Sequence, residues 1–385
     1  MITREIKETL MEYARSFRAV LVVGPRQSGK TTLVKQCFTE KPYVSLENPD
    51  QRELATEDPK AFLNRFPQGA ILDEVQRAPL LFNYLQEILD NSNDDGLFIL
   101  TGSNNILLQE NVTQSLAGRI GILDLLPLSY REISQFPSSL TLSDIIPRGF
   151  YPEIYDKHRK PQLWYPSYIR TYVERDVQQI KQIENGLLFQ KFLKLCAGRI
   201  GQQVNIASLS NDCGIDIRTV QSWLSVLQST YIIYLLQPFH QNFNKRIVKS
   251  PKLYFYDTGL SCSLLNIKTS DEFLLTHFKG ALVENFFVTE CIKNNQNNQQ
   301  GEQFYYWRDN NGVEVDLIVE KQNKILPIEI KAAQTYTKDF SKNLKKFKSY
   351  SGINEGCIVY DGTTEFKGSN GIEVLHWSNY LKRDN

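Results

Sequence analysis

Short apolar runs separated by helix-like stretches mark the first third of the chain. The runs AVLVV at 19–23, AIL at 70–72 and LFIL at 97–100 have the length and composition of buried strands, and TTLVKQCF at 31–38 has a helix-like pattern. Buried strands that alternate with helices predict a parallel sheet with helices packed on its faces. We therefore expect an α/β fold in this part of the chain.

Two amphipathic segments near the middle of the chain flank Gly214. NIASLSNDC at 205–213 predicts a first helix, and IDIRTVQSWLSVLQST at 215–230 predicts a second one. The apolar face of the second helix is made by Ile217, Val220, Leu224 and Leu227. This pattern is typical of a helix-turn-helix, and the apolar segments YIIYLLQPF and KLYFYD that follow would form the wing of a winged helix.

The start of this second helix carries polar side chains, in the part of a recognition helix that reads base edges in a DNA major groove. They are Arg218, Thr219, Gln221 and Ser222. The formal net charge is +6 over residues 151–260, −4 over residues 1–150 and −1 over residues 261–385. A polyanion is attracted to the positive segment, so DNA is the partner expected at residues 151–260. A module of the same shape that only packs between domains is the alternative.

Residues 24–31 read GPRQSGKT, a complete G-x-x-x-x-G-K-[ST] phosphate-binding loop between a strand-like and a helix-like segment. Its glycines let backbone N–H groups wrap around a phosphate chain at a helix N-terminus. Lys30 would reach the β- and γ-phosphates, and the Thr31 hydroxyl would coordinate Mg²⁺. The nucleotide contacts are expected from Gly24, Pro25, Arg26, Gln27, Ser28, Gly29, Lys30, Thr31 and Thr32.

Acidic residues end the next predicted strand, which reads AILDEVQ at 70–76. The carboxyl ends of parallel strands form the crevice in which ligands of α/β sheets bind. Asp73 suits a carboxylate that helps to hold Mg²⁺, and Glu74 suits a base that orients the attacking water. The alternative is that the Asp-Glu pair only begins a turn.

Polar residues also end the third predicted strand, GLFILTGSN. Thr101, Ser103 and Asn104 would sense the γ-phosphate or position water. Further on, SLAGR places Arg119 where its charge would meet the γ-phosphate of its own or of a neighbouring subunit. An ordinary surface arginine is the alternative.

Composition is that of an ordinary globular protein: 385 residues, 41% hydrophobic and 23% charged, enough for two or three domains. The six cysteines are scattered without a C-x-x-C pair, which predicts reduced thiols rather than zinc ligands or disulfides. No apolar run approaches the roughly 20 residues that span a bilayer, and the charged amphipathic N-terminus differs from a signal peptide. We therefore expect a cytoplasmic protein without a membrane partner.

A second set of charged residues lies in the last third of the chain. Glu284 falls on a predicted helix, Asp316 on the strand-like GVEVDLIVE, and Glu329 with Lys331 on the strand-like LPIEIK, where residues two apart share a face. Carboxylates with a lysine can hold Mg²⁺ and polarise a water for phosphodiester attack. The alternative is a solvated, salt-bridged strand end. The polar run NNQNNQQGEQ at 294–303 predicts a loop.

These motifs together resemble a family of bacterial and archaeal P-loop ATPases that join an AAA-type ATPase domain to a C-terminal domain known as DUF4143. The resemblance rests on GPRQSGKTTL, ILDEVQ, LTGSN, SLAGR, LPLSYRE, YIRTYVERDV, LYFYDTGL, GALVENF, YYWRDNNGVEVDLIV and LPIEIK. It implies a three-layer P-loop core of the ASCE type at 1–135, a helical and winged-helix region at 136–265, and a domain at 266–385 similar to the PD-(D/E)XK nuclease fold. It also implies ATP as the nucleotide.

In this family likeness, Lys30 and Thr31 match the Walker A motif, and Asp73 and Glu74 match Walker B. The nuclease signature is matched by Asp316, Glu329 and Lys331. One departure stands at the start of that signature, where VEVD supplies Asp316 after Glu314 and no Pro-Asp pair is present. The resemblance therefore implies the architecture more firmly than it implies DNA cleavage.

The combined expectation is an ATPase that couples hydrolysis to a DNA-associated activity, with Glu74, Lys30 and Arg119 as the catalytic residues. Two alternatives remain open. In one, the C-terminal cluster is a Mg²⁺-dependent DNA nuclease that ATP gates. In the other, the chain is a nucleotide-dependent switch for protein partners, with an inactive nuclease-like domain. An oligomer is required only if Arg119 acts on the nucleotide of a neighbour.

Overall fold

The computed structural model describes residues 2–103, 116–136, 141–173, 186–239, 250–369 and 371–383. Its first region contains a five-stranded sheet in the order β2-β3-β4-β1-β5, in which every neighbouring pair is parallel. The strands are β1 (Ala19–Gly24), β2 (Tyr43–Ser45), β3 (Ile71–Asp73), β4 (Phe98–Ser103) and β5 (Ile120–Asp124). The predicted α/β fold with a parallel sheet is thereby confirmed.

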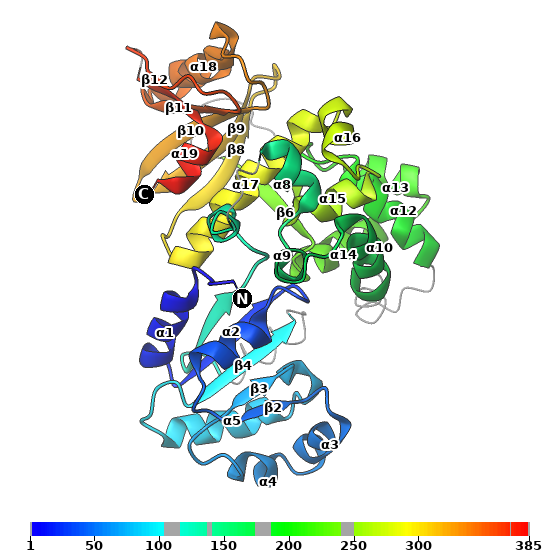
Figure 1. Cartoon of the computed structure of the whole chain (residues 1–385), viewed down its shortest axis with the longest axis vertical. Coiled ribbons are helices and arrows are strands. Elements are labelled where there is room, and N and C mark those ends of the chain that lie inside the picture. The colour runs from blue at the N-terminus through cyan, green and yellow to red at the C-terminus, as the bar shows by residue number, and fades with distance from the viewer. Residues whose placement is uncertain are drawn as a thin grey trace.

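Helices cover both faces of this sheet (Figure 1). Because successive residues of a strand point to opposite sides, each strand contributes side chains to the core on either face. Val20 and Val22 of β1 share a core with α1 (Lys7–Ser16) and α2 (Lys30–Cys37). Leu21 and Val23 belong to the opposite core. That second core includes residues of α3 (Pro49–Glu57), α4 (Pro59–Asn64) and α5 (Leu81–Asn91), and a short 3-10 turn, η1 (Val75–Arg77), follows β3.

The middle region is mostly helical and contains two strands. The two helices expected on either side of Gly214 are present: Asn205 and Asp216 cap their N-termini, and Gly214 takes the left-handed conformation at φ 80° between them. The elements are α7 (Tyr130–Ile133), α8 (Leu142–Arg148), α9 (Pro152–Asp156), α10 (Pro161–Tyr168), the π-helix η2 (Ile169–Val173), α12 (Gly186–Ala197), α13 (Ile206–Cys213), α14 (Ile217–Ser229), β6 (Ile233–Pro238), β7 (Lys252–Phe255), α15 (Thr258–Leu264) and α16 (Ser270–Leu275).

The last region is built on an eight-stranded sheet in the order β12-β13-β11-β10-β9-β8-β6-β7. The sheet is mixed, since β10 pairs antiparallel with β9 and parallel with β11. Its edge is formed by β6 and β7, which precede the boundary expected at residue 265, so one continuous sheet joins the middle and last regions. The other elements are α17 (Lys279–Asn298), β8 (Gln303–Arg308), β9 (Glu314–Lys321), β10 (Lys324–Lys331), η3 (Lys338–Ser341), α18 (Lys342–Ser351), β11 (Gly356–Tyr360), β12 (Phe366–Lys367), β13 (Ile372–His376) and α19 (Trp377–Lys382).

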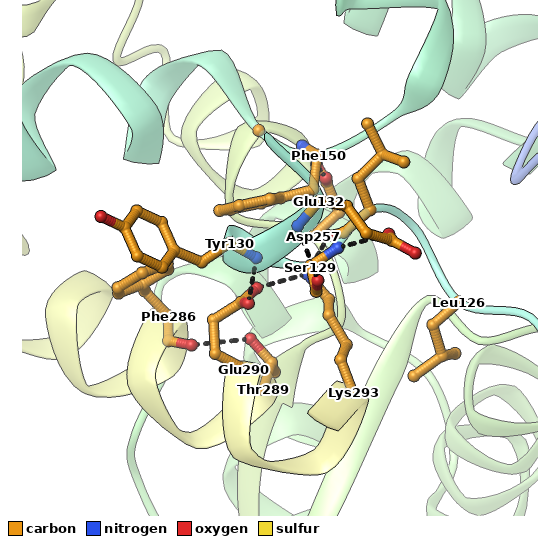
Figure 2. A network of polar contacts seen from close by, with 12 residues as sticks. Leu126, Ser129, Tyr130, Glu132, Phe150, Asp257, Phe286, Thr289, Glu290 and Lys293 are labelled. Atoms are coloured by element: carbon orange, nitrogen blue, oxygen red, sulfur yellow. Dashed lines mark hydrogen bonds and ion pairs between the residues drawn. The ribbon is translucent and has the colours of Figure 1, made fainter. Parts of the chain in front are cut away.

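Helix α17 connects all three regions through buried polar contacts (Figure 2). Lys293 donates to the Glu290 carboxylate at 2.8 Å and to the Leu128 carbonyl at 3.0 Å, and Glu290 also accepts the backbone N–H of Tyr130. The Lys293 ammonium lies 4.0 Å from the centre of the Phe150 ring. The end of the first region is thus anchored to the helix that opens the last one. Within the described ranges, none of the helices combines the length and apolar composition needed to cross a membrane.

Candidate functional site

A cavity of about 500 Å³ opens where β1 and β3 end and where α2 begins. One wall belongs to the first region and includes the loop that follows β1. The opposite wall belongs to the middle region, from α9, the residue after it and η2. The lining residues are Ile2, Arg4, Arg26, Gln27, Gly29, Lys30, Thr31, Thr32, Leu33, Gln36, Glu47, Glu74, Pro152, Glu153, Asp156, Lys157 and Tyr172.

Two glycines shape the loop. Gly24 has φ +148°, and a Cβ there would lie 2.2 Å from the Leu125 carbonyl oxygen, so a side chain does not fit. Gly29 has φ +97° and caps the start of α2. Lys30 follows it; its ammonium is buried and donates to the carbonyls of Gly24 at 3.0 Å and Pro25 at 2.9 Å.

Six of the expected phosphate contacts line the cavity: Arg26, Gln27, Gly29, Lys30, Thr31 and Thr32. Gly24, Pro25 and Ser28 are not among the lining residues and form the turn behind it. Ser28 is buried, and its hydroxyl has no hydrogen-bond partner among the described residues. A buried hydroxyl without a partner is costly, so Ser28 is an unsatisfied polar group in the turn beside the cavity.

The Asp73 carboxylate is held by hydroxyl groups. Thr31 Oγ1 lies 3.0 Å from Asp73 Oδ1, and Tyr43 donates to Asp73 Oδ2 at 2.7 Å. Thr101, the predicted residue on β4, donates to Oδ1 as well. Burial, followed by the hydrogen bond to Asp73, raises the pKa of the Tyr43 phenol. All three of these contacts to the Asp73 carboxylate come from hydroxyl groups.

Glu74 comes next and takes the left-handed conformation, with φ 58° and ψ 46°. This unusual backbone conformation turns the chain at the end of β3 and leaves Glu74 lining the cavity. The Gln76 amide donates to the Glu74 carboxylate and, at 3.0 Å, to the Ser103 hydroxyl at the end of β4. Asn104, the next expected contact, lies outside the described residues.

Arg119 does not reach this cavity. It directly precedes β5, and Ala19 at the start of β1 pairs with Ile120. Arg119 therefore lies at the edge of the sheet where the parallel strands begin. The length of β1 separates that edge from the loop, about 20 Å at 3.3 Å per residue. Arg119 makes a two-pronged ion pair with Asp90 instead. A role at the nucleotide of its own chain is therefore wrong, and a role toward a neighbouring subunit stays a prediction.

Arg4 supports the phosphate-binding loop, and no sequence motif indicates this role. Its guanidinium is buried, donates to the carbonyl oxygens of Ser28 at 2.6 Å and Leu126 at 2.8 Å, and pairs with Glu132 at 2.9 Å. A charged residue near the N-terminus in a helix-like segment gives no signal for such a long-range contact. The contacts of Tyr43 and of the wall from the middle region also join residues far apart in the sequence, so local patterns do not indicate them.

The predicted C-terminal residues lie close together. Carboxylate oxygens of Glu284 and Asp316 lie within 4.8 Å of each other and of Glu314, the glutamate two residues before Asp316. Lys331 lies 3.4 Å from Asp316 and also pairs with Glu329. Burial, followed by the nearby Asp316 carboxylate, raises the pKa of Glu329 to about 8.

A further lysine enters this cluster from β7. Lys252 lies 2.8 Å from Glu284 and 2.5 Å from Glu314, and Tyr254 on the same strand donates to Glu284 at 2.6 Å. Burial lowers the pKa of Lys252, but the Glu284 carboxylate and its neighbours outweigh this effect and hold it well above its usual value. The sequence pattern predicts a wing for this strand and gives no indication of this contact.

The polar residues at the start of α14 lie partly at the surface. Arg218 and Gln221 are exposed, while Thr219 and Ser222 are half-buried. Val220, Leu224 and Leu227 are buried, as the apolar face predicts, but Ile217 is half exposed at 50%.

Three family models match the chain in succession. An AAA domain matches residues 16–134, a domain of unknown function (DUF8612) matches residues 139–271, and a second domain of unknown function (DUF4143) matches residues 279–380. The first match covers the parallel sheet and the loop that follows β1. It supports a nucleotide-binding ATPase fold for this region.

Several known proteins are similar to the chain. The uncharacterised protein Rv2008c of Mycobacterium tuberculosis is 29% identical over 360 residues, 92% of this chain and 79% of that protein. MJ1544 of Methanocaldococcus jannaschii is 22% identical and covers 80% of this chain and 73% of its own length.

Among solved structures, the Walker-type ATPase PABY2304 of Pyrococcus abyssi has a TM-score of 0.38 and 15% identity, covering 68% of this chain and 95% of its own. The order of the matched models confirms the predicted arrangement, in which an N-terminal AAA domain is joined to a C-terminal DUF4143 domain.

Proposed function

We propose that the chain binds ATP with Mg²⁺ in the cavity behind β1 and hydrolyses it. The observation that carries this proposal is that Lys30, Thr31 and Glu74 line one cavity, with Asp73 bonded to Thr31 behind them. Lys30 would exchange its bonds to the loop carbonyls for the phosphate oxygens. The backbone N–H groups of the loop and the start of α2 favour the same negative charge.

The residues present fit a magnesium ion. Mg²⁺ prefers oxygen ligands and is held in such sites by few protein groups together with the substrate phosphates. The Thr31 hydroxyl and the Asp73 carboxylate supply oxygen donors 3.0 Å apart. When bound, the ion neutralises charge on the phosphates.

Glu74 is proposed as the base that orients the attacking water. Its carboxylate accepts from Gln76, and Gln76 also bonds Ser103, so the ends of β3 and β4 share one polar link. A change at the γ-phosphate position would pass through this link to both strand ends.

Hydrolysis is proposed to move the middle region. Glu153, Asp156, Lys157 and Tyr172 line the cavity opposite the loop, so a bound nucleotide would contact both regions. Loss of the γ-phosphate would remove only the contacts made to it. The wall from the middle region would then be held less tightly against the loop than before hydrolysis. The cavity therefore couples nucleotide state to the position of the region expected to meet DNA.

We further propose that α12, α13, α14, β6 and β7 form a winged helix that contacts DNA, and that the last region has a PD-(D/E)XK-like fold. The antiparallel pairing of β6 with β7 and the bridge between Gln203 and Lys252 support the winged helix. The net charge of +6 over residues 151–260 and the exposed Arg218 support the DNA contact. The order of helix, strand and strand for Glu284, Asp316 and Glu329 supports the nuclease-like fold.

Glu74→Gln tests the ATPase proposal. We expect hydrolysis to fall by about 10²- to 10⁴-fold, because the base is lost, while ATP binding measured by equilibrium titration changes little. Glu40→Gln removes an exposed carboxylate just beyond α2 and serves as the control. Hydrolysis by Glu74→Gln at the parent rate would exclude this mechanism.

The DNA contact is tested separately, by measuring binding and ATPase rate with single-stranded, duplex and branched DNA. We expect affinity to fall steeply with salt and Arg218→Ala to weaken binding, whereas Arg65→Ala, an exposed arginine of the first region, does not. ATP hydrolysis without any DNA binding would favour the switch for protein partners.

A further inference from the structure

We infer that the ammonium group of Lys252 stands where a divalent cation would bind in the C-terminal carboxylate cluster, so that the cluster is a metal-free joint. This inference concerns the cluster formed by Glu284, Glu314, Asp316 and Glu329 and does not depend on ATP hydrolysis. The carboxylates and lysine of the sequence predict Mg²⁺ at this cluster, and the position of Lys252 disagrees with that prediction.

The ammonium contacts two of the three carboxylates that could share a cation. Lys252 is only 1% exposed, and its Nζ lies 2.8 Å from Glu284 Oε1 and 2.5 Å from Glu314 Oε1. The carboxylate oxygens of Glu284, Glu314 and Asp316 approach one another within 4.8 Å, the spacing of ligands that share one cation. A lysine ammonium already joins two of those three carboxylates.

Three of the carboxylate oxygens make further contacts. Glu284 Oε1 accepts the Tyr254 hydroxyl at 2.6 Å in addition to Lys252. Asp316 Oδ2 accepts the backbone N–H of Ile330 at 2.8 Å and faces Lys331 at 3.4 Å. Arg308 lies 3.1 Å from Glu314 Oε2.

The cluster is close to charge balance before any ion is added. Lys252, Lys331 and Arg308 supply three positive charges against the four carboxylates. A divalent cation gains its affinity from uncompensated carboxylate charge and would also be repelled by a buried ammonium a few ångströms away. Binding would therefore require Lys252 to leave a site in which it is almost fully buried.

The ion pairs of Lys252 hold three elements together. Lys252 lies on β7, Glu284 on α17 and Glu314 on β9. Next to the ion pairs, the Asn285 side chain accepts from Phe255 N–H at 2.6 Å and donates to its carbonyl at 2.9 Å. The edge strand of the middle region is thereby fixed to the helix and sheet of the last region, so these elements move as one body.

Manganese binding to the full-length, nucleotide-free chain tests the inference. A Thr31→Ala background removes the hydroxyl ligand of the nucleotide site, and bound Mn²⁺ is measured by electron paramagnetic resonance. In this background we expect no Mn²⁺ site that depends on Asp316, so adding Asp316→Asn should leave the amount of bound Mn²⁺ unchanged. Lys252→Met should create one site, at least tenfold tighter than any in the parent background, and the added Asp316→Asn should remove it again. Lys321→Met, which removes a lysine of β9 that pairs outside the cluster, should create none.

Two results would overturn the inference. One is a Mn²⁺ site in the Thr31→Ala background that disappears with Asp316→Asn. The other is a folded Lys252→Met chain that gains no site. If Lys252→Met does not fold, the Mn²⁺ measurement on the Thr31→Ala chain, with and without Asp316→Asn, still tests the inference. A Mn²⁺ site that is lost with Asp316→Asn contradicts the inference, and the absence of such a site supports it.

Discussion

Asp73 illustrates how a single side chain prepares the nucleotide site. Hydroxyl groups of Thr31, Tyr43 and Thr101 converge on its carboxylate from three elements. Hydroxyl donors fix the orientation of a carboxylate but leave its negative charge uncompensated, unlike an arginine or lysine partner. These three bonds therefore hold the carboxylate beside Thr31, where we propose that Mg²⁺ binds.

Tyr43→Phe should weaken this arrangement without changing the shape of the core. The variant removes the 2.7 Å bond to Asp73 Oδ2 and leaves the ring in place. A hydrogen bond to a charged group contributes about 1.5–3 kcal/mol, so we expect kcat/KM for ATP at limiting Mg²⁺ to fall by about tenfold or more. Tyr13→Phe, whose hydroxyl bonds the exposed Gln299, is the matched control. Equal effects of the two variants would argue against the clamp.

The residues of the first site were predictable because their motif is local. The loop, the strand before it and the helix after it are contiguous in sequence, and Asp73 and Glu74 end an apolar strand pattern of their own, so the positions of these residues could be predicted from local patterns. Their roles stay predictions. Arg4, Tyr43 and Lys252 act across large sequence separations, and no local pattern indicates such contacts. Arg119 was misplaced because SLAGR says nothing about which edge of the sheet it would reach.

At the scale of elements, α17 departs most from its predicted extent. The polar run 294–303 predicted a loop, yet the helix continues to Asn298. Tertiary contacts supply the reason: the Asn297 carbonyl accepts from Thr9 at 2.7 Å, and the Asn295 side chain bonds the backbone of Glu302 on both sides. Such contacts override low helix propensity.

Lys293→Met should destabilise the molecule through this helix. The change leaves the buried Glu290 carboxylate without its cation and the Leu128 carbonyl without its donor. Breaking one partner of a buried pair costs about 3–5 kcal/mol, and adding Glu290→Gln should recover part of this loss. Thermal unfolding measures both, with Lys279→Met at the start of the same helix as the control.

The same variant should also change the pH dependence of stability. Burial already raises the pKa of Glu290, and Lys293 opposes that rise. Without Lys293, the folded-state pKa rises further above its unfolded value of about 4.3. A carboxyl with a raised folded pKa contributes stability below the unfolded pKa that is lost as pH rises through the folded pKa. The unfolded-state pKa is common to both proteins, so the Tm difference between the parent and Lys293→Met should widen as pH rises from the raised folded-state pKa of Glu290 in the parent toward the higher one in the variant. A constant difference would contradict this account.

In the whole molecule, the nucleotide cavity and the C-terminal cluster are joined by a continuous set of buried contacts. Arg4 links the phosphate-binding loop to Glu132, and Glu132 accepts the backbone N–H of Ser129 at 2.9 Å. The neighbouring Tyr130 bonds Glu290 on α17, the helix that also carries Glu284 (Figure 2). Among the described residues, the three regions thus meet at one helix, an arrangement that the sequence could not indicate.

Because the middle region forms one wall of the cavity, ATP affinity should depend on it. Lys157 follows α9 and lines the cavity, where its ammonium would face a bound triphosphate; its ion pair with Glu153 is exposed and contributes little by itself. We expect Lys157→Ala to raise the Kd for ATP by about three- to tenfold and to make ATP binding less sensitive to salt. Lys160→Ala is the matched control, since Lys160 carries the same charge three residues further on but lines only the neighbouring cleft. Equal losses from both lysines would indicate a general field effect, whereas a loss confined to Lys157→Ala would mean that the nucleotide is bound between the two regions.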